Sequence, residues 1–494
     1  MGGLALATLL ARADVDVTIL EAHPDWIGGW AHTFPVNGYT FAAGPRYLWN
    51  FGPGQIGQRF LEKCGLTERV PMAELDRQGF DHIYVGDDEP IRVPNGWAAY
   101  EELLKRQFPA DRQGISRFFS LCRTVFRAFE VIDEYGLYLE PWNRVLWKCF
   151  LRRPLSTAWI LRHRYFTLEQ AFETCRLSDR LRTVLYAHGG VFALPPQLLS
   201  FHAYAAGTLI YHRGCYYPVH DMAGFVGALA DTIQRHKGRI LRNQRVVSAK
   251  ATDGGIRHVK TQTAETFAAD MVVVNFDPQT FLTLVDHPGG THSPRIPRYK
   301  YSQSASSLFL GVTDARILLP RFGNWNIWYR AGTEPAPELY DAGPLDEPKA
   351  LYVNCPTLVK GLNNDAPPGH ATLTAFAPCS YRACRSAGPT AQVWKDKHAA
   401  MLIELIDRRF APGLKEKVGA IYLQTPDDKE RMMYAPEGSI YGRSLEPREV
   451  WTKIPFKGLL PNLYFTGAYV SFPGIASVIH GACRLYEVLT GDRV

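Results

Sequence analysis

The sequence lacks the features that mark several large classes of protein. Its nine cysteines are scattered, odd in number and without a C-x-x-C pair, which indicates free thiols in a reducing compartment and no metal site. No apolar run approaches the ~20 residues of a membrane-spanning helix. No basic segment leads into an apolar stretch at the start of the chain, so we do not expect a secreted protein.

The chain also has only a small excess of positive over negative charge. The 55 Lys and Arg residues exceed the 48 Asp and Glu residues by only +7 over 494 residues, without the dense basic stripe of a nucleic-acid binder. We therefore expect no nucleic-acid partner. A hydrophobic content of 46% and a charged content of 21% are typical of folded proteins. The length predicts roughly two to four domain-sized parts.

The first residues resemble half of a βαβ unit. Gly2 and Gly3 open an apolar helix, which is followed by a predicted strand over Val15–Leu20 and then by Glu21. A dinucleotide-binding fold places an acid about 20 residues after its last glycine, and here the spacing is 21 − 3 = 18. The first strand and two further glycines would precede Met1, so we hypothesise that the start is truncated or misassigned. The alternative is an ordinary helix and strand of an unrelated fold.

Two further parts of the chain carry similar patterns. Gly28 and Gly29 follow the acid closely, and Gly44 ends a β-like stretch. Later segments predict helices over 222–235 and 475–489 and strands over 238–241, 246–247, 269–275 and 462–468. The last helix begins after Pro473 and Gly474, where unpaired backbone N–H groups suit a phosphate or a flavin carbonyl.

Aromatic residues gather in two places. Phe118, Phe119, Phe126 and Phe129 recur at helical spacing, which favours a core stripe over a ligand pocket. From Trp142 to Tyr165 aromatic residues alternate with Lys and Arg. This segment is typical of a membrane interface, with cations at anionic head groups, and equally of a solvated basic face over core-facing aromatics.

Taken in order, these segments resemble the FAD-dependent phytoene desaturase superfamily, closest to its carotenoid isomerase and retinol saturase branch. The matching pieces are Gly2-Gly3 with Leu20-Glu21, Gly28-Gly29, Phe41 to Pro45, Arg106 to Pro109 with Gly114 to Phe118, Tyr217-Pro218, Val272 to Pro278, Ala366 to His370 and Asn462 to Gly481. The resemblance covers nearly the whole chain. It implies an α/β, Rossmann-like FAD-binding domain, its first strand apparently missing, with an inserted mixed α+β substrate domain.

The resemblance also implies boundaries and cofactor contacts. The FAD-binding domain would comprise residues 1–90, 214–280 and 431–494. The substrate domain would comprise a helical, membrane-facing part over residues 91–213 and a mixed sheet over residues 281–430. The cofactor-side residues would be Gly2, Gly3, Glu21, Gly28, Gly29, Gly44, Val246, Gly467, Ala468, Pro473 and Gly474. Among them, Gly3 would face the pyrophosphate, Glu21 the adenosine ribose and Val246 the adenine side.

One departure from the family pattern concerns catalysis. The family often has Tyr-Pro-x-Gly-Gly where this chain has Tyr217 to Asp221, so His220 and Asp221 replace two glycines. His220 would move protons beside the flavin while Asp221 orients it. The alternative, which we weigh as the stronger, is that Asp221 caps the helix from Met222 and His220 is a turn residue.

The function implied by the resemblance is an FAD-dependent oxidoreductase or isomerase of carotenoid biosynthesis type. Its substrate would be a long apolar polyene or isoprenoid, a carotenoid or retinoid, that is isomerised, saturated or desaturated at the flavin. The protein would be cytoplasmic or plastid and peripheral to a membrane through Trp142 to Tyr165. Two alternatives are a flavin-free carotenoid carrier and an FAD-dependent amine oxidase relative.

Overall fold

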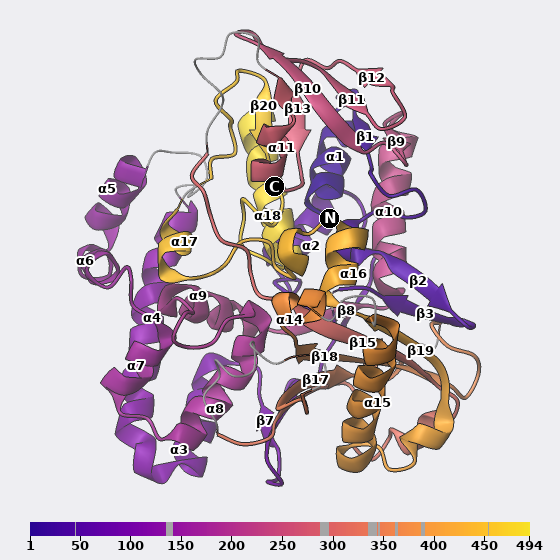
Figure 1. Cartoon of the computed structure of the whole chain (residues 1–494). Coiled ribbons are helices and arrows are strands. Elements are labelled where there is room, and N and C mark those ends of the chain that lie inside the picture. Colours follow the sequence, from indigo (N-terminus) through magenta and orange to yellow (C-terminus); the bar gives the residue numbers. More distant parts are fainter. Residues whose placement is uncertain are drawn as a thin grey trace.

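The computed structural model describes the chain except residues 45, 135–141, 287–295, 334–342, 344–345, 361–363, 387–390 and 453. Pro45, one of the residues in the family resemblance, lies outside the described residues. Of Trp142 the backbone alone is described. Figure 1 shows an upper part, which contains both ends of the chain, above a broad sheet flanked by helices.

The upper part is an α/β unit built from three distant stretches of sequence. Its paired parallel strands are β1 (Thr18–Leu20) with β9 (Arg239–Leu241), and β13 (Val272–Val274) with β20 (Leu463–Phe465). Helix α1 (Gly2–Arg12) is mostly buried and packs against α10 (Asp221–Arg235) and α18 (Ile475–Thr490) (Figure 1). Within the described ranges β1 and β13 do not pair with each other.

These elements agree with the sequence-based expectations. Helices α1, α10 and α18 begin within one residue of the predicted starts, and β1, β9, β13 and β20 lie inside predicted strand ranges. The strand predicted at 246–247 is longer, because β10 continues to Thr252. The upstream strand proposed from the glycine spacing stays a prediction.

A second, mainly antiparallel sheet lies beside this unit at the top of Figure 1. Its strands, in spatial order, are β12 (Thr266–Phe267), β11 (Gly255–Thr261), β10 (Val246–Thr252) and β14 (Val285–Asp286). Asn462, just before β20, donates its side-chain amide to the Ile256 carbonyl at 2.9 Å and accepts the Ile256 N–H at 2.7 Å. The second sheet is thereby joined to the α/β unit.

A seven-stranded sheet forms the lower part. Its order is β19 (Val418–Gln424), β15 (Ala305–Val312), β18 (Ala371–Pro378), β17 (Ala350–Asn354), β16 (Asn326–Arg330), β6 (Asp81–Val85) and β7 (Ile91–Val93). Every residue of β15 is buried, because the strand is paired on both sides, with β19 and β18, and α15 (Ala391–Arg409) lies beside the sheet (Figure 1). The predicted boundary at residue 90 falls inside the β6–β7 hairpin of this sheet.

Helices from the middle of the chain cover one side of the molecule. They are α3 (Trp97–Gln107), α4 (Arg112–Glu134), α5 (Trp142–Arg152), α6 (Pro154–Arg162), α7 (Leu168–Cys175), α8 (Asp179–Ala187) and α9 (Phe201–Tyr211) (Figure 1). Phe118, Phe119 and Val125 of α4 are fully buried, as the helical spacing predicted.

Shorter elements connect these parts. They are η1 (Gly29–Ala31), β2 (Thr33–Val36), β3 (Tyr39–Ala42), β4 (Leu48–Trp49), α2 (Ile56–Lys63), β5 (Met72–Glu74), η2 (Pro109–Asp111), η3 (His188–Phe192), β8 (Cys215–Pro218), α11 (Pro278–Thr283), η4 (Ala315–Ile317), α13 (Pro356–Lys360), α14 (Tyr381–Ser386), η6 (Leu414–Lys417), α16 (Pro426–Met433), η7 (Pro436–Gly438) and α17 (Pro447–Trp451). The predicted class, α/β with an inserted mixed α+β part, is confirmed.

Candidate cofactor and substrate site

A single cavity of about 2060 Å³ extends from the α/β unit to the seven-stranded sheet. Sites for one small ligand usually occupy about 300–1,000 Å³. The volume therefore leaves room for a dinucleotide and a second ligand in one continuous space.

Every residue assigned to the cofactor by the resemblance lines this cavity. These residues are Gly2, Gly3, Glu21, Gly28, Gly29, Gly44, Val246, Gly467, Ala468, Pro473 and Gly474. They come from α1, β1, η1, β10 and α18 or the turns beside them, so the fold gathers positions up to 472 residues apart (474 − 2). Their individual contacts with a cofactor stay a prediction.

Helix α1 begins where three glycines meet one polar side chain. A Cβ on Gly2 would lie 2.9 Å from Asn275 Oδ1, and a Cβ on Gly467 would lie 2.7 Å from the same oxygen. Gly467 also has a φ of +91°, which favours glycine. Close backbone approach at a helix N-terminus suits a pyrophosphate, because the first N–H groups of the helix lack intrahelical partners.

Glu21 lies at the end of β1. Its Oε1 accepts the His23 N–H at 2.9 Å, and its own backbone joins β9 and the following turn through Leu241 and Gln244. Burial is the largest cause of a raised pKa at this carboxyl group, against the opposing hydrogen bond from His23. A partly buried acid directly after β1 is suited to accept hydrogen bonds from ribose hydroxyls.

Two more turns bring backbone to the cavity. Gly28 has a φ of +100°, and a Cβ there would lie 3.0 Å from Val226 of α10. A Cβ on Gly44 would lie 2.6 Å from the Trp30 carbonyl oxygen. The N-terminus of α1, Glu21 and the turns at Gly28, Gly44 and Gly467 together form a glycine-lined cradle. This cradle fits the dinucleotide that the sequence predicts.

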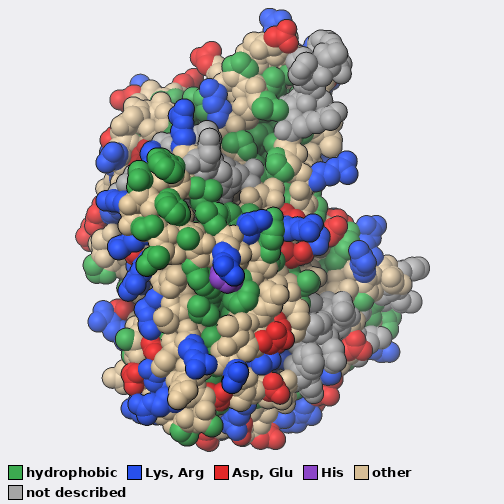
Figure 2. All heavy atoms as spheres, turned by 90° about the vertical axis from the view of Figure 1, so that its left-hand side faces the viewer, with side chains coloured by type: hydrophobic (Ala, Val, Ile, Leu, Met, Phe, Trp, Pro, Cys, Tyr) green, Lys and Arg blue, Asp and Glu red, His purple; other side chains and the backbone are tan. Residues whose placement is uncertain are grey.

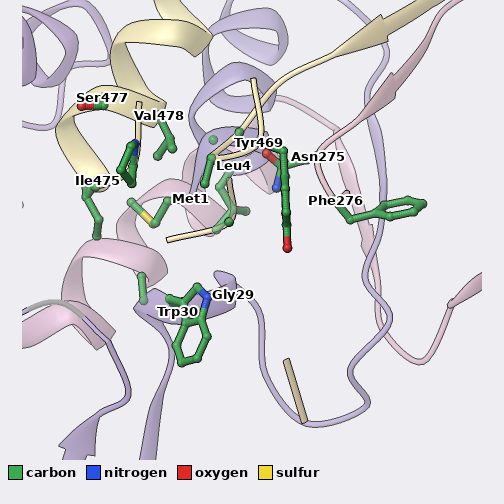
Figure 3. A pocket seen from close by; sticks show the side chains of 18 of the residues that line it. Met1, Leu4, Gly29, Trp30, Asn275, Phe276, Tyr469, Ile475, Ser477 and Val478 are labelled. Atoms are coloured by element: carbon green, nitrogen blue, oxygen red, sulfur yellow. The ribbon is translucent and has the colours of Figure 1, made fainter. Parts of the chain in front are cut away.

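Figure 3 shows how several cavity residues lie. Ile475, Ser477 and Val478 of α18 stand on one side, and Asn275 and Tyr469 stand on the other. Gly474, with a φ of +99°, occupies the N-cap of α18, so the first N–H groups of that helix lie at the cavity. This end of α18 can stabilise negative charge on a bound ring.

The opposite wall is apolar and aromatic. It includes Tyr186, Val191, Phe192, Ile210, Trp328, Leu351, Tyr352 and Phe376, together with Phe126 and Phe129 of α4. The sequence predicted that the α4 stripe is core rather than pocket, yet Phe126 and Phe129 line the cavity, and Phe129 also packs against the core. The aromatic residues of α4 differ in burial. Phe118 and Phe119 are fully buried in the core, whereas Phe126 and Phe129 are half-buried and face the cavity.

A buried carboxylate holds this aromatic wall. Asp81 of β6 accepts the Trp328 indole N–H at 2.9 Å, the Asn326 side-chain amide at 2.8 Å and the Tyr211 hydroxyl. Asn326 in turn accepts the Tyr352 hydroxyl at 2.7 Å. The network fixes two cavity-lining rings, and no sequence motif indicated it because its members lie on different elements.

His220 and Asp221 lie at the start of α10. Asp221 opens α10 with a φ of +66° and accepts the Tyr217 hydroxyl at 2.8 Å and the Met222 N–H at 3.1 Å, while His220 occupies the N-cap. In the described part of the chain neither residue lines the cavity. The catalytic role assigned to them stays a prediction.

The polar and charged residues of the cavity include three that the sequence did not predict there, Asn275, Arg46 and Lys429. Asn275 ends the predicted strand at 269–275, and its position directly after a buried strand was a usable signal. Arg46 and Lys429 also line the cavity. Nothing in the spacing of either residue separates it from an ordinary surface cation.

Comparison with known proteins places the chain among flavoproteins. Residues 1–484 match the family described as flavin containing amine oxidoreductase. All-trans-retinol 13,14-reductase of Danio rerio is 23% identical, over 99% of this chain and 84% of that protein. Phytoene desaturase (lycopene-forming) of Pantoea ananas is 24% identical, over 94% and 92% of the two chains. Prolycopene isomerase 1, chloroplastic, of an Oncidium hybrid cultivar is 24% identical, over 95% and 77%.

Solved structures show the same fold. An oxidoreductase from Methanosarcina mazei superposes with a TM-score of 0.65 at 16% identity, covering 99% of this chain and 98% of that one. Wild-type putrescine oxidase bound to putrescine superposes with a TM-score of 0.64 at 16% identity, covering 99% and 96%.

Proposed function

The chain belongs to the flavin containing amine oxidoreductase family, with FAD as its cofactor, and we propose that it saturates or isomerises a double bond of a long apolar polyene. The observation that carries this proposal is the single cavity in which a glycine-lined cradle meets an aromatic wall. Relatives named for reactions on retinol, phytoene and prolycopene support this substrate class. A flavin-free carrier is not favoured in a family of flavoenzymes.

Different residues of this chain would bind the different parts of FAD. FAD, when bound, supplies hydride exchange with a substrate carbon. The N-terminus of α1 and the adjoining glycines would bind the pyrophosphate, Glu21 would accept hydrogen bonds from the ribose, and the N-terminus of α18 would stabilise negative charge on the flavin.

The aromatic wall would hold the hydrocarbon chain of the polyene through apolar contacts. Each CH₂ transferred from water contributes about 0.8 kcal/mol. The wall also keeps water from the reacting carbons, which protects them from side reactions. A small protonated amine would gain little from this lining, because it needs acceptors such as carboxylates or carbonyl groups.

The test is to measure flavin and turnover together. The FAD-loaded protein is reduced anaerobically with dithionite and mixed with all-trans-retinol or a cis-carotenoid. In parallel, the oxidised FAD-loaded protein is mixed with putrescine in air, and the products of each reaction are separated by chromatography. We expect a saturated or isomerised polyene and no amine oxidation. Flavin bands with amine turnover alone would contradict the proposal.

We further propose that α5 and α6 attach the protein to a membrane surface. Figure 2 shows hydrophobic side chains with Lys and Arg among them on the face that carries these helices. Trp147, Leu151 and Leu155 are 65%, 69% and 86% exposed, and Arg152 and Arg153 lie between them in sequence. Apolar side chains ringed by cations favour an anionic bilayer. None of the described helices is long and apolar enough to cross one.

Vesicle sedimentation tests this attachment. Replacing both Leu151 and Leu155 by Asp removes two apolar contacts worth about 1.5–3 kcal/mol each, so binding to anionic vesicles falls more than about a hundredfold. The matched control is Leu319→Asp, which changes a leucine that is 57% exposed and lies outside these helices. An equal loss in both variants would contradict a specific surface. The cytoplasmic or plastid compartment stays a prediction.

A further inference from the structure

Two buried cations share one wall of the cavity. Arg46 is 5% exposed and Lys429 of α16 is 1% exposed, and both line the cavity. Each positive charge enlarges the penalty of burying the other, because like charges repel more strongly where water is excluded.

Arg46 is held by aromatic rings and backbone. Its guanidinium carbon lies 5.3 Å from the Phe309 ring centroid and 4.7 Å from that of Phe376. The guanidinium donates to the carbonyls of Ala42 and Ala43, while the buried Nε has no hydrogen-bond partner. Among the described residues no carboxylate forms an ion pair with Arg46.

Burial is the main influence on the charge of Arg46. Burial lowers the pKa of Arg46 to about 10, and Tyr217, Tyr352 and Asp221 oppose this from a distance. Asp221 is already engaged by the Tyr217 hydroxyl and the Met222 N–H.

Lys429 is likewise held by backbone carbonyl groups. Its Nζ donates to the carbonyls of Ala305 and Gln424, and within the described ranges it too has no carboxylate partner. The adjacent carboxylate of Asp428 is used by Lys395, at 2.7 Å, and by Arg431, at 2.6 Å.

The pKa of Lys429 reflects these surroundings. It is lowered to about 7 chiefly by burial, with a smaller effect from the Arg46 charge, while Cys379, Asp428 and Cys384 act in the opposite direction. Both cations lie over the same part of the seven-stranded sheet, Lys429 at the Ala305 carbonyl of β15 and Arg46 against the rings of Phe309 of β15 and Phe376 of β18. A ligand with a delocalised negative charge would relieve both at once.

We propose that Arg46 and Lys429 form a subsite for a carboxylate at the end of the polyene ligand. This inference rests on the proposed function. Lys429 is anchored to the seven-stranded sheet through Ala305 of β15. Arg46 lies against Phe309 of β15 and Phe376 of β18 and donates to the Ala42 and Ala43 carbonyls at the end of β3. An Arg fork matches the two oxygens of a carboxylate, and the surrounding rings accept the apolar chain. A second source of similar charge is the electron-rich edge of reduced flavin, and the experiment separates the two.

The experiment compares two probes that share one polyene and differ at its end. Equilibrium dialysis of the FAD-loaded protein measures the dissociation constants of all-trans-retinoic acid and all-trans-retinol. We expect the acid to bind at least tenfold more tightly. Arg46→Gln and Lys429→Met each remove this preference without changing retinol binding, and Lys429→Arg retains it. Lys300→Met, an exposed lysine outside the cavity paired with Glu446, is the matched control and leaves both constants unchanged.

Each other outcome overturns a defined claim. Equal binding of acid and alcohol by the native protein overturns the carboxylate subsite and leaves the proposed function standing. If neither polyene binds to protein that holds FAD, the proposed function fails and the subsite with it. If the variants change the flavin midpoint potential but not the acid-to-alcohol ratio, the cations act on the flavin instead. Thermal unfolding identifies a variant that does not fold. If Arg46→Gln does not fold, the acid-to-alcohol binding ratios of Lys429→Met and Lys429→Arg decide whether the subsite exists.

Discussion

The two walls of the cavity recognise ligands in different ways. The cradle around α1 uses backbone, since Gly2, Gly28 and Gly467 leave space that a single Cβ would fill. The wall formed by the seven-stranded sheet and the middle helices uses side chains, held by contacts such as the Trp328 hydrogen bond to Asp81. Backbone recognition tolerates almost no substitution, whereas side-chain recognition can be changed one group at a time.

The largest expected effect is on the backbone wall. Gly467→Ala combines an unfavourable φ of +91° with a Cβ 2.7 Å from Asn275 Oδ1. Strain and overpacking of about 2–3 kcal/mol together predict a roughly hundredfold loss of FAD affinity, measured by flavin absorbance after dialysis.

Gly413→Ala is the matched control for this change. Gly413 has a φ of +87° but nothing within 4 Å of an added Cβ. It shares the strain without the close approach, so FAD affinity stays at the native value. If both variants lose FAD equally, close approach at Gly467 is not the reason.

A smaller effect is expected on the aromatic wall. Phe129→Ala removes a half-buried ring that lines the cavity, which is worth about 2 kcal/mol of apolar contact. Retinol should bind roughly 30-fold more weakly while FAD content is unchanged. Fluorescence titration checks this, with Leu319→Ala outside the cavity as the control. Loss of FAD in Phe129→Ala would show that the two walls are not separable.

The smallest effect concerns Glu21, which belongs to the backbone wall but acts through a side chain. Its pKa is raised mainly by burial, so the folded protein binds its proton more tightly than the unfolded chain does. Stability without FAD therefore falls as pH rises through the ordinary Glu range and the raised pKa.

Glu21→Gln should remove that dependence and raise the unfolding temperature of the FAD-free protein at neutral pH. The same change should weaken FAD binding only about fivefold, since the amide still accepts a hydrogen bond worth about 1 kcal/mol less. Thermal scans at pH 4.5 and 7.5 with and without FAD measure both effects. Identical pH profiles for the two proteins would contradict the assignment.

The contrast between the walls also explains what the sequence could predict. Glycine spacing, the acid 18 residues after Gly3 and the strand and helix at the end of the chain predicted the cradle, because backbone contacts depend on local conformation. The aromatic wall was not predictable in the same way. Asp81, Asn326 and Tyr352 meet only through pairing between β6, β16 and β17, which no local pattern encodes.

The continuity of the cavity has a thermodynamic consequence. Ligands that occupy adjoining parts of one space change each other's binding free energy, and this coupling must be reciprocal. A polyene that tightens FAD binding by some factor is itself bound more tightly to the FAD-loaded protein by the same factor. The amount of FAD that this protein retains therefore depends on which substrate is present and on its concentration.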